Sequence, residues 1–250
     1  QDLSERGRKA SEQDRDYRDH KQWTAYELNT LTKRGQPPIV INRIARKVDT
    51  IIGLSERSAS DPKGYPRTPK DEESAEVCTD TLRFVCDQNR YPRTKSMMLE
   101  NMIVEGTAGA EIIVEDRNGE PDVIINRLRW EEIFADPYSR ENDFSDARYK
   151  GIAKWMHVDD VEALWGTEAG KMAHDSLSGS SMTSGSFEDR PKQMSGMTDL
   201  RGKRVVVVDM YCQYGGAWHR YVFCTGGDLI PGGLSPYLDE DKKPSCVIEL

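Results

Sequence analysis

An Asn-Gly pair at residues 118 and 119 constrains the fold more tightly than any other local feature of the chain. It separates two β-rich runs in the segment AEIIVEDRNGEPDVIINRL, residues 110–128. A two-residue hairpin loop needs positive φ at both central positions, and Asn-Gly meets this need readily. The segment therefore predicts an antiparallel hairpin. The runs RVVVVDMYCQY and AWHRYVFC, which flank Gly215–Gly216, predict a second one.

Helical patterns come before the first hairpin. Residues 14–35 predict a polar helix that ends at a glycine, with Trp23, Tyr26 and Leu31 as apolar contacts. Residues 39–56 place five apolar side chains at helical spacing, which predicts an amphipathic helix. These side chains are Ile41, Ile44, Val48, Ile51 and Ile52.

Two further helices are expected between residues 68 and 106. Thr68 has the character of an N-cap, Pro69 suits the first helical position, and Asp71 completes a capping box. The apolar face of this helix is predicted to contain Ala75, Cys78, Leu82, Val85 and Cys86. In the following helix, the side chains expected to face the interior are Met98, Leu99, Met102 and Ile103.

The order of these elements indicates an α+β fold, with N-terminal helices followed by β-hairpins and short helices. A strand is expected at residues 146–157 and a short helix at residues 157–166. We divide the chain into a helical and α+β region at 1–177, a flexible Ser/Gly/Met-rich loop at 178–202 and a β-hairpin region at 203–250. That loop is predicted to be disordered, and the alternative is an arm that orders against a neighbour.

Composition excludes several classes of protein. The formal net charge is −8, and the small basic excess of residues 1–60 is outweighed by the rest of the chain. The chain therefore lacks the strong basic excess that is typical of a protein that binds nucleic acid tightly by neutralising phosphates. Five cysteines without a C-x-x-C pair argue against a disulfide framework and a zinc ribbon.

No apolar run is long enough to span a membrane. Because the chain opens on Gln1, without a leader, and closes on PSCVIEL, we expect a piece of a longer protein.

The stretch IFADPYSRENDFSDARY, residues 133–149, concentrates oxygen-bearing side chains and allows two interpretations. The first is a metal-dependent hydrolase acting on nucleic acid through Asp136, Asp143 and Asp146. The second is a loop held by its own turn chemistry, in which Ser139 and Asn142 accept hydrogen bonds from local backbone donors. The spacing does not fit a helix–loop–helix calcium site. Turn chemistry accounts for more of the residues, and we favour it.

Other catalytic motifs are missing or incomplete. GTEAGKM, residues 166–172, lacks the glycine spacing of a phosphate loop and carries Met172 in place of the hydroxyl that binds magnesium. There is no H-E-x-x-H and no G-x-S-x-G, and the four histidines are scattered singly. We therefore expect no catalytic residue, no metal ligand and no cofactor.

The same acidic stretch, followed by KWMHVDDVEAL, resembles the portal proteins of tailed phages, most closely the short-tailed group. Upstream, VINRIARKVDTIIGLSERS resembles an early helix of that family, and downstream SPYLDEDKKP resembles the stretch before its stem. The resemblance covers most of residues 17–250. The matching motif residues are Asp136, Pro137, Ser139, Asp143, Ser145, Asp146, Ala147, Arg148, Tyr149, Trp155, Met156 and Asp159.

The resemblance implies a structural subunit of a ring, usually of twelve copies, at one vertex of the capsid. It implies a virion protein, assembled in the host cytoplasm, that is not an enzyme and contacts no membrane. Implied partners are other copies of itself, the major capsid protein, the terminase large subunit, head-tail adaptor or tail proteins, and double-stranded DNA in the channel. The chain corresponds to the wing region, and the stem, clip and crown lie outside it.

The helix at residues 39–56 is our candidate subunit contact, because Arg43, Arg46 and Lys47 line its polar face. Such a basic stripe also fits a face turned to phosphate or simply to solvent. A closed ring joins two different faces of neighbouring copies, and the uneven charge along the chain is compatible with complementary faces.

Overall fold

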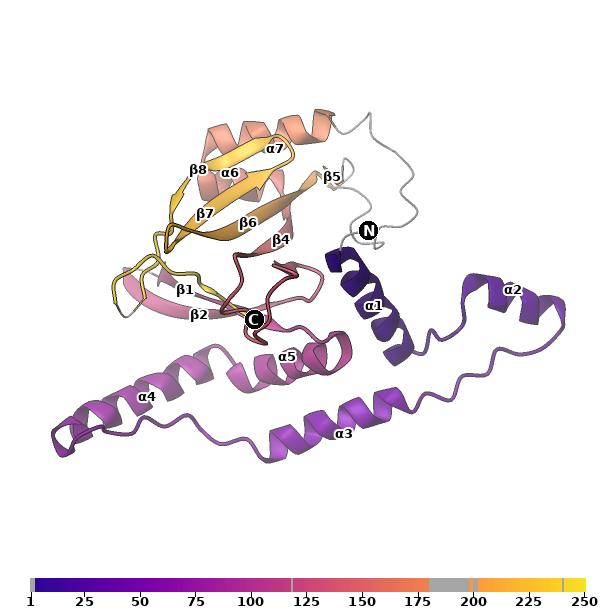
Figure 1. Ribbon diagram of the computed structural model, residues 1–250, viewed down its shortest axis with the longest axis horizontal. Coiled ribbons are helices and arrows are strands. Elements are labelled where there is room, and N and C mark those ends of the chain that lie inside the picture. The colour runs from indigo at the N-terminus through magenta and orange to yellow at the C-terminus, as the bar shows by residue number, and fades with distance from the viewer. Residues whose placement is uncertain (1–2, 118, 180–197, 200–201, 240) are drawn as a thin grey trace. The chain divides into compact units, whose positions relative to one another are not determined.

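The computed structural model describes residues 3–117, 119–179, 198–199, 202–239 and 241–250. The chain forms two compact units. The first unit contains residues 1–9, 109–111 and 128–250, and the second contains residues 10–108 and 112–127. Helices come first and antiparallel sheets follow, which confirms the predicted α+β class (Figure 1).

The second unit is built mainly of helices. The chain passes from the first unit into the second within α1 (Leu3–Arg18). The remaining helical elements are α2 (Ala25–Lys33), α3 (Ile44–Arg57), the short 3-10 helix η1 (Pro69–Asp71), α4 (Glu72–Gln88) and α5 (Tyr91–Glu105).

The single helix predicted at residues 14–35 is wrong, because two helices occupy this region. The break follows α1, where His20 takes a φ of 67°. A new helix then starts at Thr24, whose hydroxyl accepts the Glu27 amide at 3.3 Å while Glu27 accepts the Thr24 amide at 2.8 Å. This reciprocal capping box satisfies donors that the first turn of α2 would otherwise leave without partners.

The helix start at Thr68 is confirmed, with a capping box between Thr68 and Asp71. At the other end of α4, the side chain of Asn89 joins the helix to a strand. Its Nδ2 donates to the carbonyl of Val123 at 2.8 Å, and its Oδ1 accepts the amide of Ile125 at 2.9 Å.

Several apolar side chains expected in the interior of the second unit are exposed. Ile41, Ile44 and Ile51 are 77%, 42% and 47% exposed, whereas Ala45 and Val48 are the buried residues of α3. Cys78, Leu82 and Met102 are also exposed, contrary to the expected inward faces of α4 and α5. The apolar pattern predicts the helices correctly, but the second unit has too little apolar surface of its own to cover these side chains.

The first hairpin is confirmed. It consists of β1 (Gly109–Arg117) and β2 (Glu120–Leu128), and Gly119 has the positive φ of 89° that the turn requires. In the first unit, Ala110 and Glu111 of β1 pair with β9 (Ile248–Glu249).

The first unit contains a six-stranded antiparallel sheet with the strand order β3-β4-β6-β7-β8, and a short β5 pairs with β6. The second predicted hairpin forms its centre, and positive φ at Gly215 and Gly216 makes the turn. The strands are β3 (Ile133–Ala135), β4 (Tyr149–His157), β5 (Thr198–Asp199), β6 (Arg204–Tyr214), β7 (Ala217–Cys224) and β8 (Gly227–Leu234).

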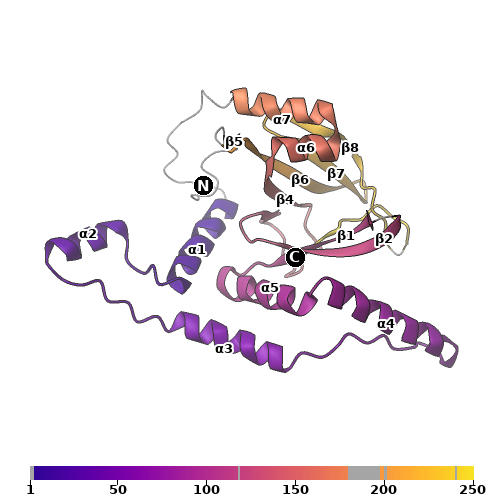
Figure 2. The ribbon, with the colours of Figure 1, turned by 180° about the vertical axis from the view of Figure 1, so that it is seen from behind.

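Two helices cover one face of this sheet, α6 (Val158–Trp165) and α7 (Thr167–Gly179), as Figure 2 shows from behind. Their inward side chains form a core with β6, β7 and β8, centred on Val161, Ala173, Val205 and Val222. A separate core of six buried residues contains Leu128, Ile133, Ile152, Tyr211, Cys246 and Ile248.

The predicted division of the chain stays a prediction, and one sheet joins two of its regions. Strands β4 and β6, which come from the predicted regions 1–177 and 203–250, are neighbours in one sheet. Most of the predicted loop at 178–202 lies outside the described residues, so its flexibility stays a prediction. Among the described helices, none combines the length and the apolar character needed to cross a bilayer.

Candidate functional site

The acidic stretch folds into a loop between β3 and β4, and Asp136 lies at its base. Asp136 is buried, its Oδ1 accepts the amide of Tyr138 at 3.0 Å, and its Oδ2 accepts the amide of Arg148 at 3.3 Å. Its own amide donates to the carbonyl of Tyr149 at 3.0 Å. One carboxylate thus joins the start of the loop to its end, twelve residues later.

Asp146 organises the middle of the loop. Its carboxylate accepts the hydroxyl of Ser139, the amide of Arg140 at 2.8 Å and the amide of Glu141 at 3.4 Å. Hydrogen bonds from Ser139 and Arg140 lower the pKa of Asp146. The loop is therefore crosslinked by one exposed carboxylate, and this geometry is typical of turn chemistry.

Asp143 makes a smaller contribution. It accepts the amide of Ser145 at 3.1 Å, and hydrogen bonds from Ser145 lower its pKa. Within the residues that the structure describes, no group of three or more His, Cys, Asp or Glu side chains is placed to hold a metal ion. The geometry offers no support for a hydrolase site built from Asp136, Asp143 and Asp146.

The other motif residues lie at the loop's end and in the strand after it. Ala147 is fully buried, and the strand begins two residues later at Tyr149. Trp155 lies in β4 opposite Val206 and is 40% exposed. The loop therefore leads directly into a central strand of the sheet, and Pro137 follows the buried Asp136 at its other end.

The three candidate contact residues lie at the start of α3, and their side chains are open to solvent. Arg43, Arg46 and Lys47 are all exposed, with Arg43 at the N-cap position of the helix. The capping bonds come from Asn42, whose Oδ1 accepts the amides of Ile44 at 3.0 Å and Ala45 at 3.1 Å. Helix α3 therefore begins at Ile44, later than predicted, because Asn42 supplies the cap.

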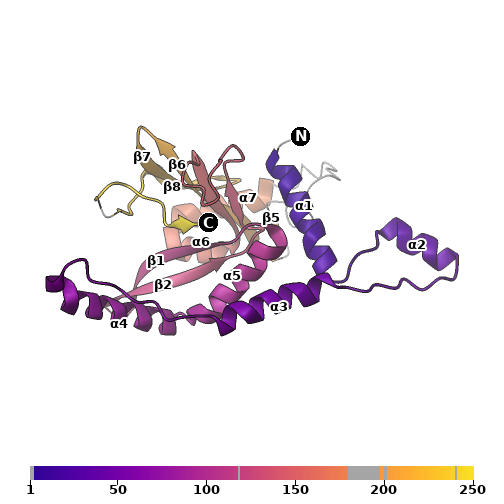
Figure 3. The same cartoon turned by 60° about the horizontal axis from the view of Figure 1, so that its bottom comes forward.

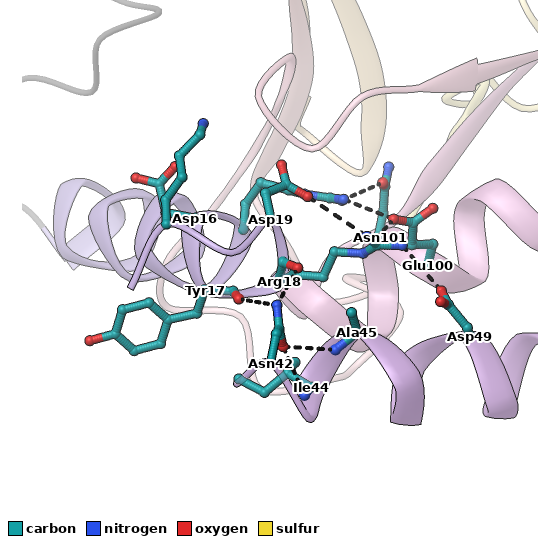
Figure 4. A network of polar contacts seen from close by, with 12 residues as sticks. Asp16, Tyr17, Arg18, Asp19, Asn42, Ile44, Ala45, Asp49, Glu100 and Asn101 are labelled. Atoms are coloured by element: carbon teal, nitrogen blue, oxygen red, sulfur yellow. Dashed lines mark hydrogen bonds and ion pairs between the residues drawn. The ribbon is translucent and has the colours of Figure 1, made fainter. Parts of the chain in front are cut away.

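Asn42 also fixes α3 to α1. Its Nδ2 donates to the carbonyls of Tyr17 at 2.9 Å and Arg18 at 2.8 Å, as Figure 4 shows. These carbonyls lie at the C-terminal end of α1, where backbone acceptors lack helical partners. One amide side chain thus caps two helices and places the basic start of α3.

An ionic network continues from this junction to α5. Arg18 contacts Asp49 of α3 at 3.2 Å and Glu100 of α5 at 3.3 Å (Figure 4). Arg15 contacts Glu100 at 2.9 Å and also pairs with the buried Glu105. Sequence reasoning missed this network because its members are far apart in the chain.

The second unit also exposes a large share of its apolar side chains. In the part of this unit that the structure describes, the only buried apolar residues are Ala45 and Val48. Large apolar side chains at least half exposed are Tyr26, Ile39, Ile41, Leu54, Tyr65, Val77, Phe84, Met102 and Val114. Exposed apolar surface of this extent marks an interaction surface in a folded protein.

Comparison with known proteins identifies relatives. The family model described as phage P22-like portal protein matches residues 1–243. The chain is also similar to the portal protein of Helicobacter pylori bacteriophage KHP30, with 25% identity over 138 residues. This alignment covers 55% of the chain but only 23% of the relative.

Proposed function

Because the chain belongs to the phage P22-like portal protein family, we propose that it is the wing region of a portal subunit. In this proposal, about a dozen copies close head to tail into a ring at one capsid vertex. The ring is the conduit through which the genome is packaged and ejected. It contacts the capsid protein, the terminase and the tail, and the chain itself catalyses no reaction.

The observation that carries this proposal is the open apolar surface of the second unit. Among its described apolar residues only Ala45 and Val48 are buried, while Phe84 and Val77 are 66% and 61% exposed. A head-to-tail ring covers two different faces of every copy, so it can bury such surfaces on several helices at once. A lone soluble subunit leaves them in water.

The acidic balance of the chain is compatible with a conduit. Proteins that hold DNA tightly do so by neutralising phosphates, and the affinity rises with the number of contacts. A chain with a formal net charge of −8 makes few such contacts. DNA can therefore pass without being held.

The test is the mass of the assembled full-length protein, measured by native mass spectrometry and by particle imaging. We expect closed rings of about a dozen copies, because a heterologous contact with the right rotation closes on itself. A protein that stays monomeric or dimeric at high concentration would overturn the proposal.

We propose that α3 contributes to the contact between subunits through Arg43, Arg46 and Lys47. Reversing Arg43 and Arg46 to Glu places like charges where opposite charges meet, so we expect the ring fraction to fall at least about tenfold. Native mass spectrometry reports this fraction. Intact rings in the double variant would remove α3 from the interface.

A further inference from the structure

One side of α4 presents two large apolar side chains that no described part of the chain covers. Val77 is 61% and Phe84 is 66% exposed. At 3.6 residues per turn, four acidic residues share this side of the helix. We call the set the α4 face, and it consists of Glu73, Glu76, Val77, Asp80, Phe84 and Asp87.

The contacts of α4 within its own unit lie away from the α4 face. Thr79 is buried and accepts the amide of Gly64, at 3.0 Å, from the loop that precedes the helix. A side chain at Gly64 would approach the carbonyl of Ala75 to 3.2 Å, so the loop lies close against the helix there. This loop therefore leaves the α4 face open.

Helix α3 presents a second open surface with the opposite charge. Ile44, Ile51 and Leu54 are 42%, 47% and 60% exposed. Helical spacing places Arg43 and Lys47 on the same side, whereas Arg46 lies around the helix from them. We call these five residues, Arg43, Ile44, Lys47, Ile51 and Leu54, the α3 face.

The two faces do not meet within one copy. Helix α3 packs on α5, with Ala45 and Val48 as its buried residues. Helices α3 and α4 lie roughly in line, as Figure 1 and Figure 3 show, and not side by side. A contact between the α4 face and the α3 face would therefore join two different molecules.

We propose that the α4 face of one copy docks on the α3 face of the next copy in the ring. This inference rests on the proposed function and names the surfaces that would join neighbouring subunits. Both faces have the same design, with apolar side chains beside a row of charges, and the charges are of opposite sign. Two different patches on every copy are what a closed head-to-tail ring requires.

The apolar and charged parts of these faces have different roles. Phe84 is the natural anchor, because aromatic side chains near the centre of an interface contribute most to affinity. The rows of opposite charge at the rim set orientation and exclude the like-with-like pairing of two α4 faces. A stable interface buries more than about 1,000 Å², so these faces form one part of a larger contact.

Two charge-reversal variants of the full-length protein test the pairing. The first carries Arg43→Glu and Lys47→Glu on the α3 face. The second carries Glu73→Lys, Glu76→Lys and Asp87→Lys, which makes the α4 face basic, and leaves the 3.8 Å pair of Asp80 with Arg83 untouched. We expect each variant alone to give at least about tenfold fewer rings than wild type, because like charges then face each other at every interface.

The decisive measurement is an equimolar mixture of the two variants. In an alternating ring every reversed α3 face meets a reversed α4 face, and every unchanged face meets an unchanged one. We therefore expect the mixture to recover rings, and native mass spectrometry of isotope-labelled subunits should find both variants in equal numbers.

Control variants carry the same changes in charge on exposed residues of the first unit. One control carries Asp160→Lys, Asp175→Lys and Asp228→Lys, and the other carries Arg129→Glu and Lys203→Glu. Both controls are expected to form rings as wild type does. Circular dichroism checks that every variant is folded.

The outcomes separate this inference from the proposed function. Recovery in the mixture supports the pairing of α3 with α4. Rings in either variant alone, or a mixture that stays unassembled, would overturn the pairing but leave the portal ring in place, with the faces then assigned to another partner such as the capsid. A wild-type protein that forms no ring would overturn the proposed function itself.

Discussion

The carboxyl group of Glu105 lies inside the helical unit, with a fully buried side chain. Burial raises its pKa, and hydrogen bonding and charge from Arg15 act against that rise. A buried carboxylate without a partner is costly, whereas one paired with a guanidinium is tolerated. The stability of this unit should therefore depend on Arg15 and on pH.

Replacing Arg15 with Met should lower the free energy of unfolding by about 3 kcal/mol at neutral pH, because it leaves a buried charge unpaired. The loss should shrink as pH falls through the raised pKa of Glu105 in the folded variant, and it should be smallest once this carboxyl group is protonated in both folded proteins. The sign follows from the raised pKa of Glu105, since the folded state binds this proton more tightly than the unfolded state. Urea unfolding at several pH values measures the difference.

The matched control is Lys21→Met, which removes a 3.3 Å ion pair with Asp16 in which the lysine side chain is 69% exposed. Exposed pairs contribute about 0–1 kcal/mol, so this variant should unfold close to wild type at every pH. Equal losses in the two variants would show that Glu105 does not depend on Arg15.

Asp136 should matter for stability because it closes the loop between β3 and β4. Replacing it with Ala removes the acceptor for two backbone amides, so we expect a loss of about 1–3 kcal/mol in urea unfolding. Asp143→Ala removes one exposed acceptor and should cost less. If magnesium or manganese raised the unfolding midpoint of wild type but not of Asp136→Ala, the loop would be a metal site after all.

At the scale of single residues, the sequence predicts hydrogen bonds between neighbours in the chain but not those between residues far apart. The turn interpretation anticipated the bond from Asp136 to the amide of Tyr138, two residues away, but not the bond from Asp136 to the amide of Arg148, twelve residues away. Ser139 donates its hydroxyl to Asp146 and to the carbonyl of Glu141, where we had expected it to accept a backbone amide. Arg15 and Glu105 are 90 residues apart, and no local pattern joins them.

At the scale of elements, the contact between the β7–β8 turn and α7 depends on a residue without a side chain. A Cβ atom on Gly226 would lie 2.2 Å from the carbonyl oxygen of Met172 and 2.7 Å from the hydroxyl of Ser176. The backbone of α7 would have to shift to admit it. A glycine is therefore required here for close approach.

Gly226→Ala should destabilise the protein by about 1–3 kcal/mol, the usual effect of overpacking a tight contact. Gly233→Ala is the matched control in the adjacent strand, since a Cβ atom there meets nothing within 4 Å. Thermal unfolding of the two variants compares them directly. Equal melting temperatures would mean that α7 can move away from the turn at no cost.

The sequence predicted those elements whose signals are local. Both hairpins were found from their turn dipeptides, and the start of α2 could have been found from Thr24 and Glu27. Strand β8 was missed because Pro231, Gly232 and Gly233 interrupt its pattern, yet β8 lies at the edge of the sheet, where proline is tolerated.

Helix α7 was missed for a related reason. Its Gly170, which belongs to the false phosphate-loop match, lies close to α6, and a Cβ atom there would be 2.7 Å from that of Glu162. Packing between two helices requires this glycine, and helix propensity alone does not predict it.

At the scale of the whole chain, the two units differ in how much core they contain. The first unit holds two apolar cores built on its sheet, whereas the only buried apolar residues in the described part of the second are Ala45 and Val48. Local opening is easiest where few apolar contacts are buried. The helical unit should therefore be the less stable one before assembly.

Hydrogen exchange in unassembled subunits should follow this difference. We expect the amides of β6 and β7 to exchange slowest, and those of α3 and α4 to exchange at least about tenfold faster. If the α3 and α4 faces are buried between copies, assembly should slow exchange in both helices. Helices α6 and α7, which are already packed on the sheet, should change little and serve as the internal control.

The pattern of protection also discriminates between partners. Slowing of α3 and α4 together in rings of the portal protein alone requires no other component, and it points to contacts between copies. If α4 became protected only after the capsid protein was added, its exposed Phe84 would belong to a contact with the shell. In that case the exposed apolar surface of the helical unit would bind the capsid protein. Ring closure would then depend on other surfaces of the chain.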